Sequence, residues 1–402
     1  MNAAQMHWII LLVALAPYIY YLLCIYGARR FFRSAASPPQ HAAEYTPPVS
    51  ILKPVRGLDR EAGENFSSFC RLDYPQYELL FCVGEADDPA IPVIEQLMRD
   101  FPERSIRLLV GADRLGNNDK VCKLCRLARE ARYSLLAVSD SDIRVSPDYL
   151  RQVVAPFRDP KVGAVTTLFR GLAGRGLGSR LEAVSGSVEF CSGAIAALCM
   201  EGVRFAHGAT MATTRQRLAE IGGFEALADL HSDDFAFGNR IAARGHRVAL
   251  LPRAVWMVYP AQTMRDYLLH ELRWMIGLRN IRPWGHFGLV FTHGIFWSVL
   301  AAMIAPSSAI AAAYLGAYLG LRTWMAWEVG VRGVQDEVLR QNMWLVPVRD
   351  ALAVFVWLGS FFSNRIRWRG VRFTIQAGRL VPAMEAAPAE NRVSAPRASD
   401  AS

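Results

Sequence analysis

Cysteine and lysine are both scarce in this chain of 402 residues. The seven cysteines are an odd number and most lie inside apolar runs, which excludes a disulfide framework and indicates a reducing compartment. Only Lys53, Lys120, Lys123 and Lys161 are lysines, so arginine supplies nearly all of the positive charge. Such a preference for arginine is typical of proteins from GC-rich bacteria.

The composition also lacks the polar excess of a disordered chain. Hydrophobic residues make up 52 % of the sequence, with ten Trp and twenty Phe, which is high even for a soluble protein. The formal net charge is +9, and a basic surface suits nucleic acid, anionic lipid or a phosphate-bearing substrate. Because the apolar segments described next indicate a membrane protein, we expect a lipid bilayer as a partner and no nucleic acid.

Charge is absent from Trp8–Tyr26, a run of 19 residues that is long enough to cross a bilayer core of about 30 Å. A cleavable signal peptide is the alternative, but its apolar core would be shorter and would follow a basic start. Here the basic residues, Arg29, Arg30 and Arg33, come afterwards. The positive-inside rule then places the N-terminus outside and the following chain in the cytoplasm. We therefore expect residues 1–33 to be a transmembrane anchor of an inner membrane protein.

A second apolar region lies near the C-terminus. Phe287–Pro306 and Ser308–Leu321 predict a helical pair with a turn near Pro306. A third block, Ala351–Phe362, has 12 residues, which is short for a span, so it either crosses only with help or forms a re-entrant or interfacial segment. The basic stretch NRIRWRGVR that follows favours a cytoplasmic position, and hence a third block that does not cross.

These patterns divide the C-terminal part of the chain into two. We assign residues 286–375 to a C-terminal membrane region. The Ala-, Pro- and Ser-rich residues 383–402 are predicted to form a disordered tail.

The middle of the chain, residues 48–282, alternates strand-like and helix-like segments. This alternation predicts an α/β domain with a mostly parallel sheet, followed by an interfacial helix. In such sheets ligands bind beyond the carboxyl ends of the strands. Two acidic clusters stand at such ends, Asp87–Asp88 and Asp140-Ser141-Asp142, and they mark the expected mouth of a site. The expected segments, in order, are PVSILKPV, YELLFCVGEADD, IPVIEQLMRDFP, IRLLVGA, KVCKLCRLAREAR and SLLAVSDSD.

Asp140 and Asp142 leave a strand end two residues apart, so both carboxylates can reach one hard cation or its water shell. Mg²⁺ and Mn²⁺ prefer oxygen ligands and are often shared with the phosphates of a substrate. The alternative is that these residues form a turn or cap a helix. Further along, Asp233 and Asp234 precede a helical segment. The stretch from 264 to 282 is basic and amphipathic, which is also typical of an interfacial helix that binds anionic headgroups.

Taken in order, these elements resemble family-2-type glycosyltransferases of the GT-A fold, whose pattern is three separated Asp positions followed by (Q/R)-x-x-R-W. More closely, the chain is similar to ceramide glucosyltransferases and their bacterial relatives, the hopanoid-biosynthesis-associated glycosyltransferases. The similarity covers roughly residues 48–375. It is carried by VSILKPVRGLD, LDYPQYELLFCVGEADDPA, VSDSDIRVSPDYL, HSDDFAFGNRIAARG, HELRW, VPVRDALAVFVW and IRWRGVRF.

The resemblance implies a role for each matching residue. Asp88 corresponds to the first Asp, which contacts the nucleotide, and Lys120 stands where relatives carry a lysine near the nucleotide. Asp140 and Asp142 correspond to the metal-binding pair, and Asp234 to the catalytic Asp.

The remaining roles fall on the membrane side of the site. Arg273 and Trp274 match the R-W pair, with Arg273 near the diphosphate and Trp274 near the acceptor. His270 stands where the family usually has Gln or Arg, so its role is open. His207 is either an acceptor or donor contact or a structural histidine.

The expected fold is therefore a GT-A-type nucleotide-sugar-binding domain with N-terminal and C-terminal transmembrane helices. The expected reaction is inverting transfer of a hexose, N-acetylglucosamine or glucose, from a UDP-sugar to a hydroxyl of a membrane lipid. The acceptor is a hopanoid such as bacteriohopanetetrol, or a ceramide, and the cofactor is Mg²⁺ or Mn²⁺. The alternatives are a processive polysaccharide synthase and a non-catalytic, membrane-anchored protein that binds sugar nucleotide or lipid.

Overall fold

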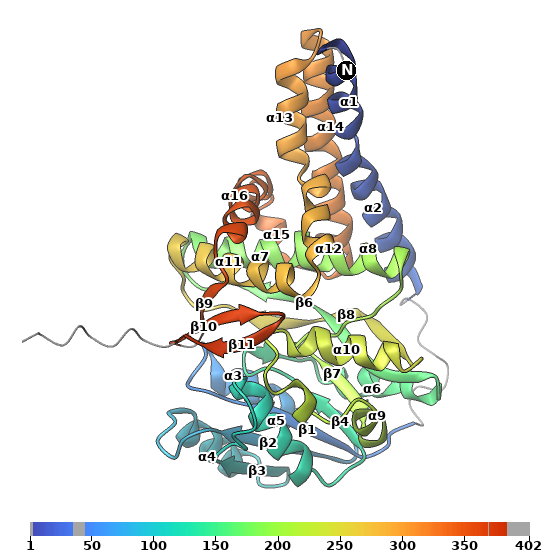
Figure 1. Ribbon diagram of the computed structural model, residues 1–402. Coiled ribbons are helices and arrows are strands. Elements are labelled where there is room, and N and C mark those ends of the chain that lie inside the picture. Colours follow the sequence, from blue (N-terminus) through green and yellow to red (C-terminus); the bar gives the residue numbers. More distant parts are fainter. Residues whose placement is uncertain (1–2, 35–44, 369, 384–402) are drawn as a thin grey trace, which may run out of the picture.

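The computed structural model describes residues 3–34, 45–368 and 370–383 (Figure 1). It shows an α/β domain with a bundle of long helices that rises from one side, and both ends of the described chain belong to structures outside the central sheet. Apart from Ala383, the predicted disordered tail lies outside the described residues.

An eight-stranded, mostly parallel sheet forms the centre of the α/β domain, with the strand order β3-β2-β1-β4-β7-β6-β8-β5. Strands β3, β2, β1 and β4 are parallel, β7 is antiparallel to both of its neighbours, and β6 is parallel to β8. The short β5 pairs antiparallel to β8 at the edge. The strands are β1 Val49–Pro54, β2 Tyr77–Val83, β3 Ser105–Val110, β4 Leu135–Val138, β5 Ile143–Arg144, β6 Val162–Leu172, β7 Met211–Thr214 and β8 Arg247–Val258.

Helices cover both faces of this sheet, which is why its central strands are apolar at nearly every position. In β1, for example, Ile51 faces one core and Leu52 faces the other. One face packs against α3 Ala62–Cys70, α4 Ala90–Asp100 and α6 Tyr149–Val154, and the other against α5 Asp119–Glu130, α9 Arg215–Glu220 and α10 Asp233–Ala243. The predicted α/β alternation is confirmed, and each of the six expected segments forms the predicted kind of element.

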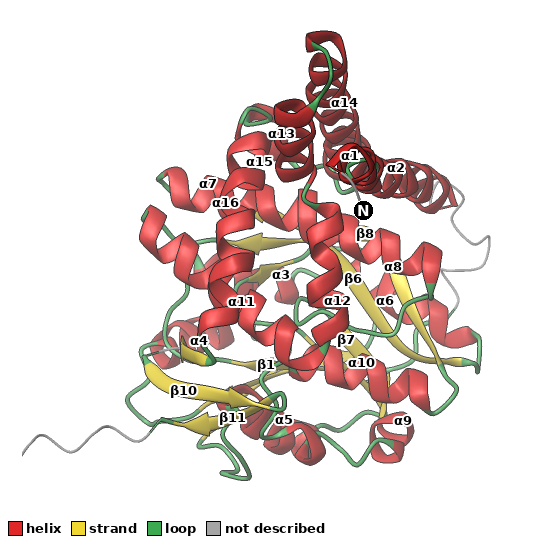
Figure 2. Ribbon diagram, turned by 45° about the horizontal axis from the view of Figure 1, so that its top comes forward, coloured by secondary structure: helices red, strands yellow, loops and turns green. Residues whose placement is uncertain are grey.

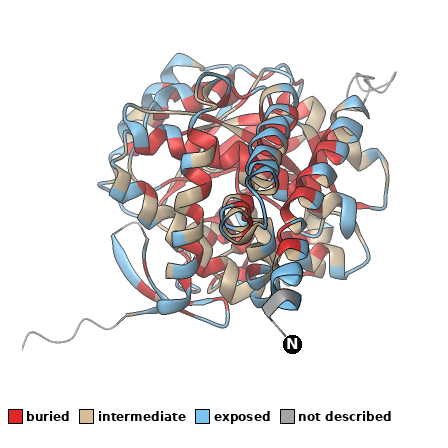
Figure 3. Cartoon of the chain, turned by 90° about the horizontal axis from the view of Figure 1, so that it is seen from above, coloured by how far each residue is buried: buried red, intermediate tan, exposed pale blue. Residues whose placement is uncertain are grey.

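A layer of helices separates the sheet from the long bundle (Figures 1 and 2). It contains α7 Leu177–Ser185, a π-helical turn η2 Gly186–Cys191, α8 Ser192–Met200, α11 Met264–Ile281 and α12 Pro283–Gly288. The predicted interfacial helix is α11. Seen from above, buried residues concentrate at the centre of this layer and exposed residues lie at the rim (Figure 3).

The bundle contains α1 Ala3–Val13, α2 Ala16–Ser34, α13 Gly294–Ile304 and α14 Ser308–Ala326. The predicted C-terminal helical pair is α13 and α14, and Pro306 lies in the turn between them. Large apolar side chains remain exposed along this bundle, as expected where lipid covers the surface. They include Trp8, Leu12, Ile19, Leu22, Phe296, Met303 and Leu319.

Within the described residues, three helical segments are long and apolar enough to cross a membrane: Gln5–Arg33, Leu177–Met200 and Leu345–Phe362. The bent pair Pro283–Thr292 and Gly294–Ile304 makes a fourth candidate if it counts as one span. The sequence analysis missed Leu177–Met200, which is 61 % buried in its apolar window and belongs to the layer beneath the bundle.

The predicted length of the third C-terminal block needs correction. The block belongs to α16, Leu345–Gly359. The whole helical segment Leu345–Phe362 has 18 residues and is long and apolar enough to cross a membrane. Its boundary was misjudged because Arg349 and Asp350 look like an end in the sequence. In the structure both side chains are buried and bonded to neighbouring helices.

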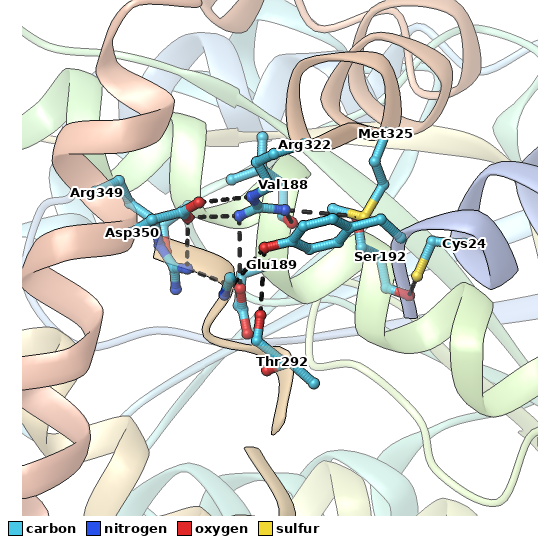
Figure 4. Close-up of polar contacts among 12 residues, drawn as sticks. Cys24, Val188, Glu189, Ser192, Thr292, Arg322, Met325, Arg349 and Asp350 are labelled. Atoms are coloured by element: carbon cyan, nitrogen blue, oxygen red, sulfur yellow. Dashed lines mark hydrogen bonds and ion pairs between the residues drawn. The ribbon is translucent and has the colours of Figure 1, made fainter. Parts of the chain in front are cut away.

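Figure 4 shows the polar network that fastens α14 and α16 to the layer below. Arg322 donates to both carboxylate oxygens of Asp350, each at 2.7 Å, and to the carbonyl of Val188 at 3.0 Å. Arg349 donates to Glu189 on η2 at 2.7 Å. Because each buried charge has a partner of opposite charge, ion pairing offsets part of the desolvation cost of burial.

The last described residues form a separate three-stranded sheet of β9 Arg365–Trp368, β10 Val371–Gln376 and β11 Arg379–Pro382. Every second side chain, including Ile366, Phe373 and Ile375, packs with Ile276 of α11. Strands thus occupy the end of residues 286–375, the range that was assigned to a membrane region. Apolar side chains alternate with polar ones in this stretch, which favours strands. Gly370 supplies the positive φ of the turn that connects β9 and β10.

Candidate active site

The carboxyl ends of β1, β2 and β4 meet at one edge of the sheet, and four acidic and basic side chains converge beyond β4. Asp140 follows this strand, and its backbone N–H donates to the carbonyl of Gly208 at 3.2 Å. Lys120 lies in the first turn of α5, and its ammonium is 2.7 Å from Asp140 Oδ1 and 3.3 Å from Asp233 Oδ2. Segments more than a hundred residues apart thus share one cluster.

Asn118 holds the start of α5 against the loop that precedes α10. Its side chain accepts from the Val121 N–H at 3.2 Å as the helix N-cap, and it donates to the carbonyl of Leu230 at 2.7 Å. The same amide nitrogen is 3.3 Å from Asp233 Oδ1. A single buried side chain therefore sets the distance between Lys120 and Asp233.

Asp234 sits in the first turn of α10 and is held by two backbone N–H groups. Gly208 donates to Oδ2 at 3.0 Å, and Phe235 donates to Oδ1 at 2.7 Å. Gly208 itself lies against the cluster: a Cβ at this position would come within 2.3 Å of Asp140 Oδ2 and 2.9 Å of the Lys120 ammonium. A larger residue at position 208 would force the ends of the Asp140 and Lys120 side chains to move.

The protonation of the cluster follows from burial and from the balance of charge. Burial raises the pKa of Asp233 to about 6, although the nearby Lys120 acts to lower it. Burial likewise raises the pKa of Asp234, against Lys120 and the N–H donors. The pKa of Lys120 is raised, because Asp140, Asp233 and Asp234 outweigh the effect of its burial. The site therefore holds a fixed cation beside carboxyls that take up protons more readily than usual.

A second lysine, which the sequence analysis did not single out, lies beneath Asp140. Lys53 is fully buried in β1, and its ammonium donates to the carbonyl of Asp140 at 2.6 Å and lies 4.0 Å from the ring centre of Phe69. Burial lowers the pKa of Lys53 to about 7, and the carboxylates of Asp142 and Asp140 offset part of that shift. The sequence signal that could have identified Lys53 is a single charged residue inside the mostly apolar strand β1.

Asp142 is half-buried two residues after Asp140, and its carbonyl accepts from the N–H of Val258 at 2.9 Å. Asp88 stands at the end of β2 and is two strands away from β4 in the sheet. Its carboxylate accepts from the N–H groups of Gly57 at 3.0 Å and Ala90 at 2.9 Å, and so shapes the loop after β1. In the described part of the chain no hydrogen bond or ion pair joins Asp88 to the Lys120 cluster.

Arg273 projects from α11 toward the loop before α10. Its guanidinium carbon lies 5.9 Å from the ring centre of Trp368 on β9, and this indole lies 6.0 Å from the ring of His231. One turn further on, Gly277 packs so closely on His231 that a Cβ would meet the imidazole at 2.7 Å. Burial, with the charge of Arg273, lowers the pKa of His231 to about 4. Arg273 thus stands beside the segment that carries Asp233 and Asp234.

Trp274, the next residue, faces an aromatic cluster on the membrane side. Its ring centre is 5.5 Å from Phe190, which in turn is 4.5 Å from His207. His207 is 5 % exposed, its Nδ1 lies 2.8 Å from the carbonyl of Thr167, and burial lowers its pKa to about 4. A neutral His207 that positions the backbone of Gly208 fits this environment.

His270 points away from the Lys120 cluster and pairs with the buried carboxylate of Glu182 on α7. Its ring also packs edge-on against Trp274, with the centres 5.2 Å apart. The structure thus gives the unusual histidine a partner in the helix layer, and joins it to the aromatic cluster rather than to Asp234.

The donor set at this edge fits a divalent cation that is shared with a substrate. Among the residues that the structure describes, no three His, Cys, Asp or Glu side chains are grouped to hold a metal by themselves. Mg²⁺ commonly takes only one or two carboxylates and completes its shell with water and substrate phosphates. Asp140 and Asp142 can supply those two carboxylates, while Lys120 occupies one side of Asp140.

The chain is similar to proteins of known function. Ceramide glucosyltransferase 3 of Caenorhabditis elegans is 26 % identical over 353 residues, or 84 % of this chain and 74 % of that protein. Ceramide glucosyltransferase 1 of the same organism is 27 % identical over 234 residues, or 57 % and 49 %. The matches therefore span about three quarters of the first relative and about half of the second.

The fold of this chain is also found in a solved structure, the mannosyltransferase PcManGT from Pyrobaculum calidifontis in complex with GDP-Man and Mn²⁺. The TM-score is 0.52 at 19 % identity, and the match covers 89 % of this chain and 99 % of that chain. This likeness supports the GT-A fold. The sequence profile described as Glycosyl transferase family 21 matches residues 8–381, and the chain therefore belongs to that family.

Proposed function

We propose that this protein is an inverting glycosyltransferase that transfers a hexose from a UDP-sugar to a hydroxyl group of a membrane lipid. The observation that carries the proposal is the convergence of Asp140, Lys120, Asp233 and Asp234 at one sheet edge, with Arg273 beside them. Membership in family 21 supports glycosyl transfer, and the two ceramide glucosyltransferases support a lipid acceptor. The candidate acceptors are ceramide and a hopanoid polyol such as bacteriohopanetetrol, and the candidate sugars are glucose and N-acetylglucosamine.

In this proposal Asp234 takes the proton from the acceptor hydroxyl. Its pKa is raised by burial, which makes it a stronger base than an exposed aspartate. The N–H groups of Gly208 and Phe235 fix its orientation. Attack from the side opposite the leaving diphosphate inverts the anomeric centre.

Positive side chains stabilise the charge that the leaving UDP acquires. Lys120 and Arg273 supply the positive charge on the protein side. Asp88 holds the loop at which the nucleotide is expected. Asp140 and Asp142 would hold Mg²⁺ or Mn²⁺, which when bound offsets negative charge on the diphosphate. Removal of divalent ions by a chelator should abolish transfer, and either ion should restore it. Transfer at the full rate in chelator would refute the metal role of this pair.

The helix layer lies between this site and the long bundle (Figure 1), and this arrangement supports a reaction at the membrane surface. A lipid acceptor stays in the bilayer, so a water-soluble donor must meet its headgroup there. Trp274, His270 and His207 belong to the layer-side wall of the site. The arginines that follow the first span favour a cytoplasmic site at the inner membrane of a bacterium.

The deciding experiment offers labelled UDP-glucose and UDP-N-acetylglucosamine, with ceramide or bacteriohopanetetrol, to membranes that contain the protein. Asp234→Asn should lower turnover by about 10²-fold or more and leave nucleotide binding intact. The exposed Asp100→Asn is the matched control and should behave as wild type. A product that carries one hexose supports the proposal. A polymer would identify a polysaccharide synthase, and nucleotide binding without any product would identify a non-catalytic protein.

A further inference from the structure

A second cleft opens away from the Lys120 cluster, where the first membrane helix meets the edge of the sheet. Its volume is about 320 Å³. We call it the arginine cleft and define it by Arg170, Arg253, Arg332, Trp256, Phe32 and Gln335, which are all among its lining residues. Asp148 is the one acidic residue in the lining, so three guanidinium groups face a single carboxylate.

The carboxylate of Asp148 already accepts hydrogen bonds from residues around the start of α6. It accepts hydrogen bonds from Ser146 Oγ at 2.5 Å and from the amide of Gln152. Arg332 shares Glu328 with Arg29, so this nearby carboxylate serves two guanidinium groups. Arg253 is exposed and makes no ion pair with any residue that the structure describes. The cleft therefore carries an excess of positive charge.

Arg170 is held in place at the floor of the cleft. One terminal nitrogen donates to the carbonyls of Val334 and Gln335 at 3.2 and 3.0 Å, and the guanidinium carbon lies 4.2 Å from the ring centre of Trp256. Its Nε is buried and has no hydrogen-bond acceptor among the described residues. Burial lowers the pKa of Arg170, although the nearby carboxylate of Asp336 offsets part of that shift, so a bound anion would reduce the remaining desolvation penalty.

Two irregular pieces of backbone shape the same cleft. The pairing of β6 with β8 skips Pro252 and Arg253, because Thr167 pairs with Leu251 and Leu168 pairs with Ala254. Such a bulge turns a side chain out of the regular alternation, here that of Arg253. Gln335 has φ 59°, a conformation that is uncommon for a residue other than glycine. Both irregularities occur where the lining residues meet.

The position of the cleft identifies the source of the anion. The span Gln5–Arg33 has 29 residues and is about 43 Å long, longer than a bilayer core of about 30 Å. Its last turn, with Phe32, therefore reaches the headgroup layer. Phe32 packs directly on Gly333, at the end of the helix that continues α14. Basic pockets at the ends of membrane helices are a recurring site for anionic headgroups.

We propose that the arginine cleft binds the phosphate of an anionic phospholipid, with the acyl chains lying beside α2. Arg170 and Arg253 bind the phosphate oxygens, and Arg332 contacts them from the membrane side. This site is separate from the proposed glycosyl transfer, because none of its lining residues belongs to the Lys120 cluster.

The test measures binding to the purified full-length protein in neutral detergent, by the shift in the thermal unfolding midpoint. The probes are dioctanoyl phosphatidylglycerol, dioctanoyl phosphatidylcholine and inorganic phosphate. Phosphatidylglycerol should raise the midpoint, and Arg253→Gln should weaken its apparent affinity about tenfold. The exposed Arg244→Gln, at the end of α10, is the matched control and should bind as wild type.

Arg332→Gln is a second variant that keeps the test informative if Arg253→Gln fails to fold. An equal shift with phosphatidylcholine would overturn the proposal, as would full affinity in both variants. A shift of the same size with inorganic phosphate would overturn the assignment to a lipid and identify a soluble anion. No outcome depends on transferase activity, so the proposed function stands or falls separately.

Discussion

Trp368 places its indole ring 5.9 Å from the guanidinium carbon of Arg273, although the two residues belong to different substructures. Trp368 lies on the small C-terminal sheet and Arg273 on the interfacial helix. The same sheet forms backbone hydrogen bonds with the loop before α10. The carbonyl of Gly378 accepts from the His231 N–H at 3.0 Å, and the Leu380 N–H donates to the carbonyl of Asp229 at 2.7 Å. The C-terminal sheet thus packs against the loop that leads to Asp233, and we expect Trp368 to position Arg273.

Replacement of Trp368 by alanine should reduce kcat/KM for the donor by about threefold to tenfold, since an exposed cation–π contact contributes about 1 kcal/mol. The loss should appear mainly in KM, because Arg273 would still be present but less restrained. Trp368→Phe keeps an aromatic face and should recover part of the effect. Unchanged kinetics in Trp368→Ala would show that the ring does not position Arg273.

Replacement of Gly208 by alanine tests whether the Lys120–Asp140 pair must stay in place. The new Cβ would come within 2.3 Å of Asp140 Oδ2, so the flexible ends of Asp140 and Lys120 would have to move. We expect activity to fall by about a hundredfold, the effect of a misplacement of about 1 Å, with little change in the unfolding midpoint. Gly193→Ala, where no atom lies within 4 Å of the new Cβ, is the control and should retain full activity.

The pH profile of transfer should respond to Lys120. The proposed base must be deprotonated to act, so kcat/KM should fall at acid pH as Asp234, whose pKa is raised by burial, takes up a proton; burial raises the pKa of the neighbouring Asp233 to about 6. Lys120 lowers the pKa of both carboxyls, so Lys120→Met should move this acid limb upward by about one pH unit or more. Lys161→Met removes an exposed lysine elsewhere and should leave the limb in place. A limb that stays fixed in Lys120→Met would contradict the assignment.

The membrane region should depend on the pair between Arg322 and Asp350. Asp350→Asn leaves the buried Arg322 without its bidentate partner and should lower the free energy of unfolding by about 3–5 kcal/mol. Thermal unfolding in detergent measures the loss. The double change Arg322→Met with Asp350→Leu should restore much of it, because no unpaired charge remains. Glu337→Gln breaks an exposed pair with Arg340 and should cost less than about 1 kcal/mol.

Much of the fold was predictable because its patterns are local. Apolar strands alternate with amphipathic helices between Val49 and Val138, and this alternation determines a parallel α/β sheet with acidic residues at the strand ends. The first span and the pair around Pro306 were equally visible as uncharged runs. The family resemblance added the expected fold class, and the family model that matches residues 8–381 confirms the family.

Contacts between distant segments were not predictable in the same way. No local pattern states that Lys120 lies between Asp140 and Asp233, or that the buried Lys53 supports Asp140 from below. The third apolar block was misjudged because Arg349 and Asp350 look hydrophilic in isolation, whereas partners on other helices neutralise them in the folded protein.

The sequence by itself determined the α/β class, the apolar spans and the residue types at the strand ends, since each follows from the spacing of neighbouring residues. The tertiary structure decided which carboxylates lie beside Lys120, that a C-terminal sheet packs next to Arg273, and that three arginines line a cleft at the end of the first span. Those relationships depend on packing and charge pairing between segments far apart in the chain, which only the folded structure brings together.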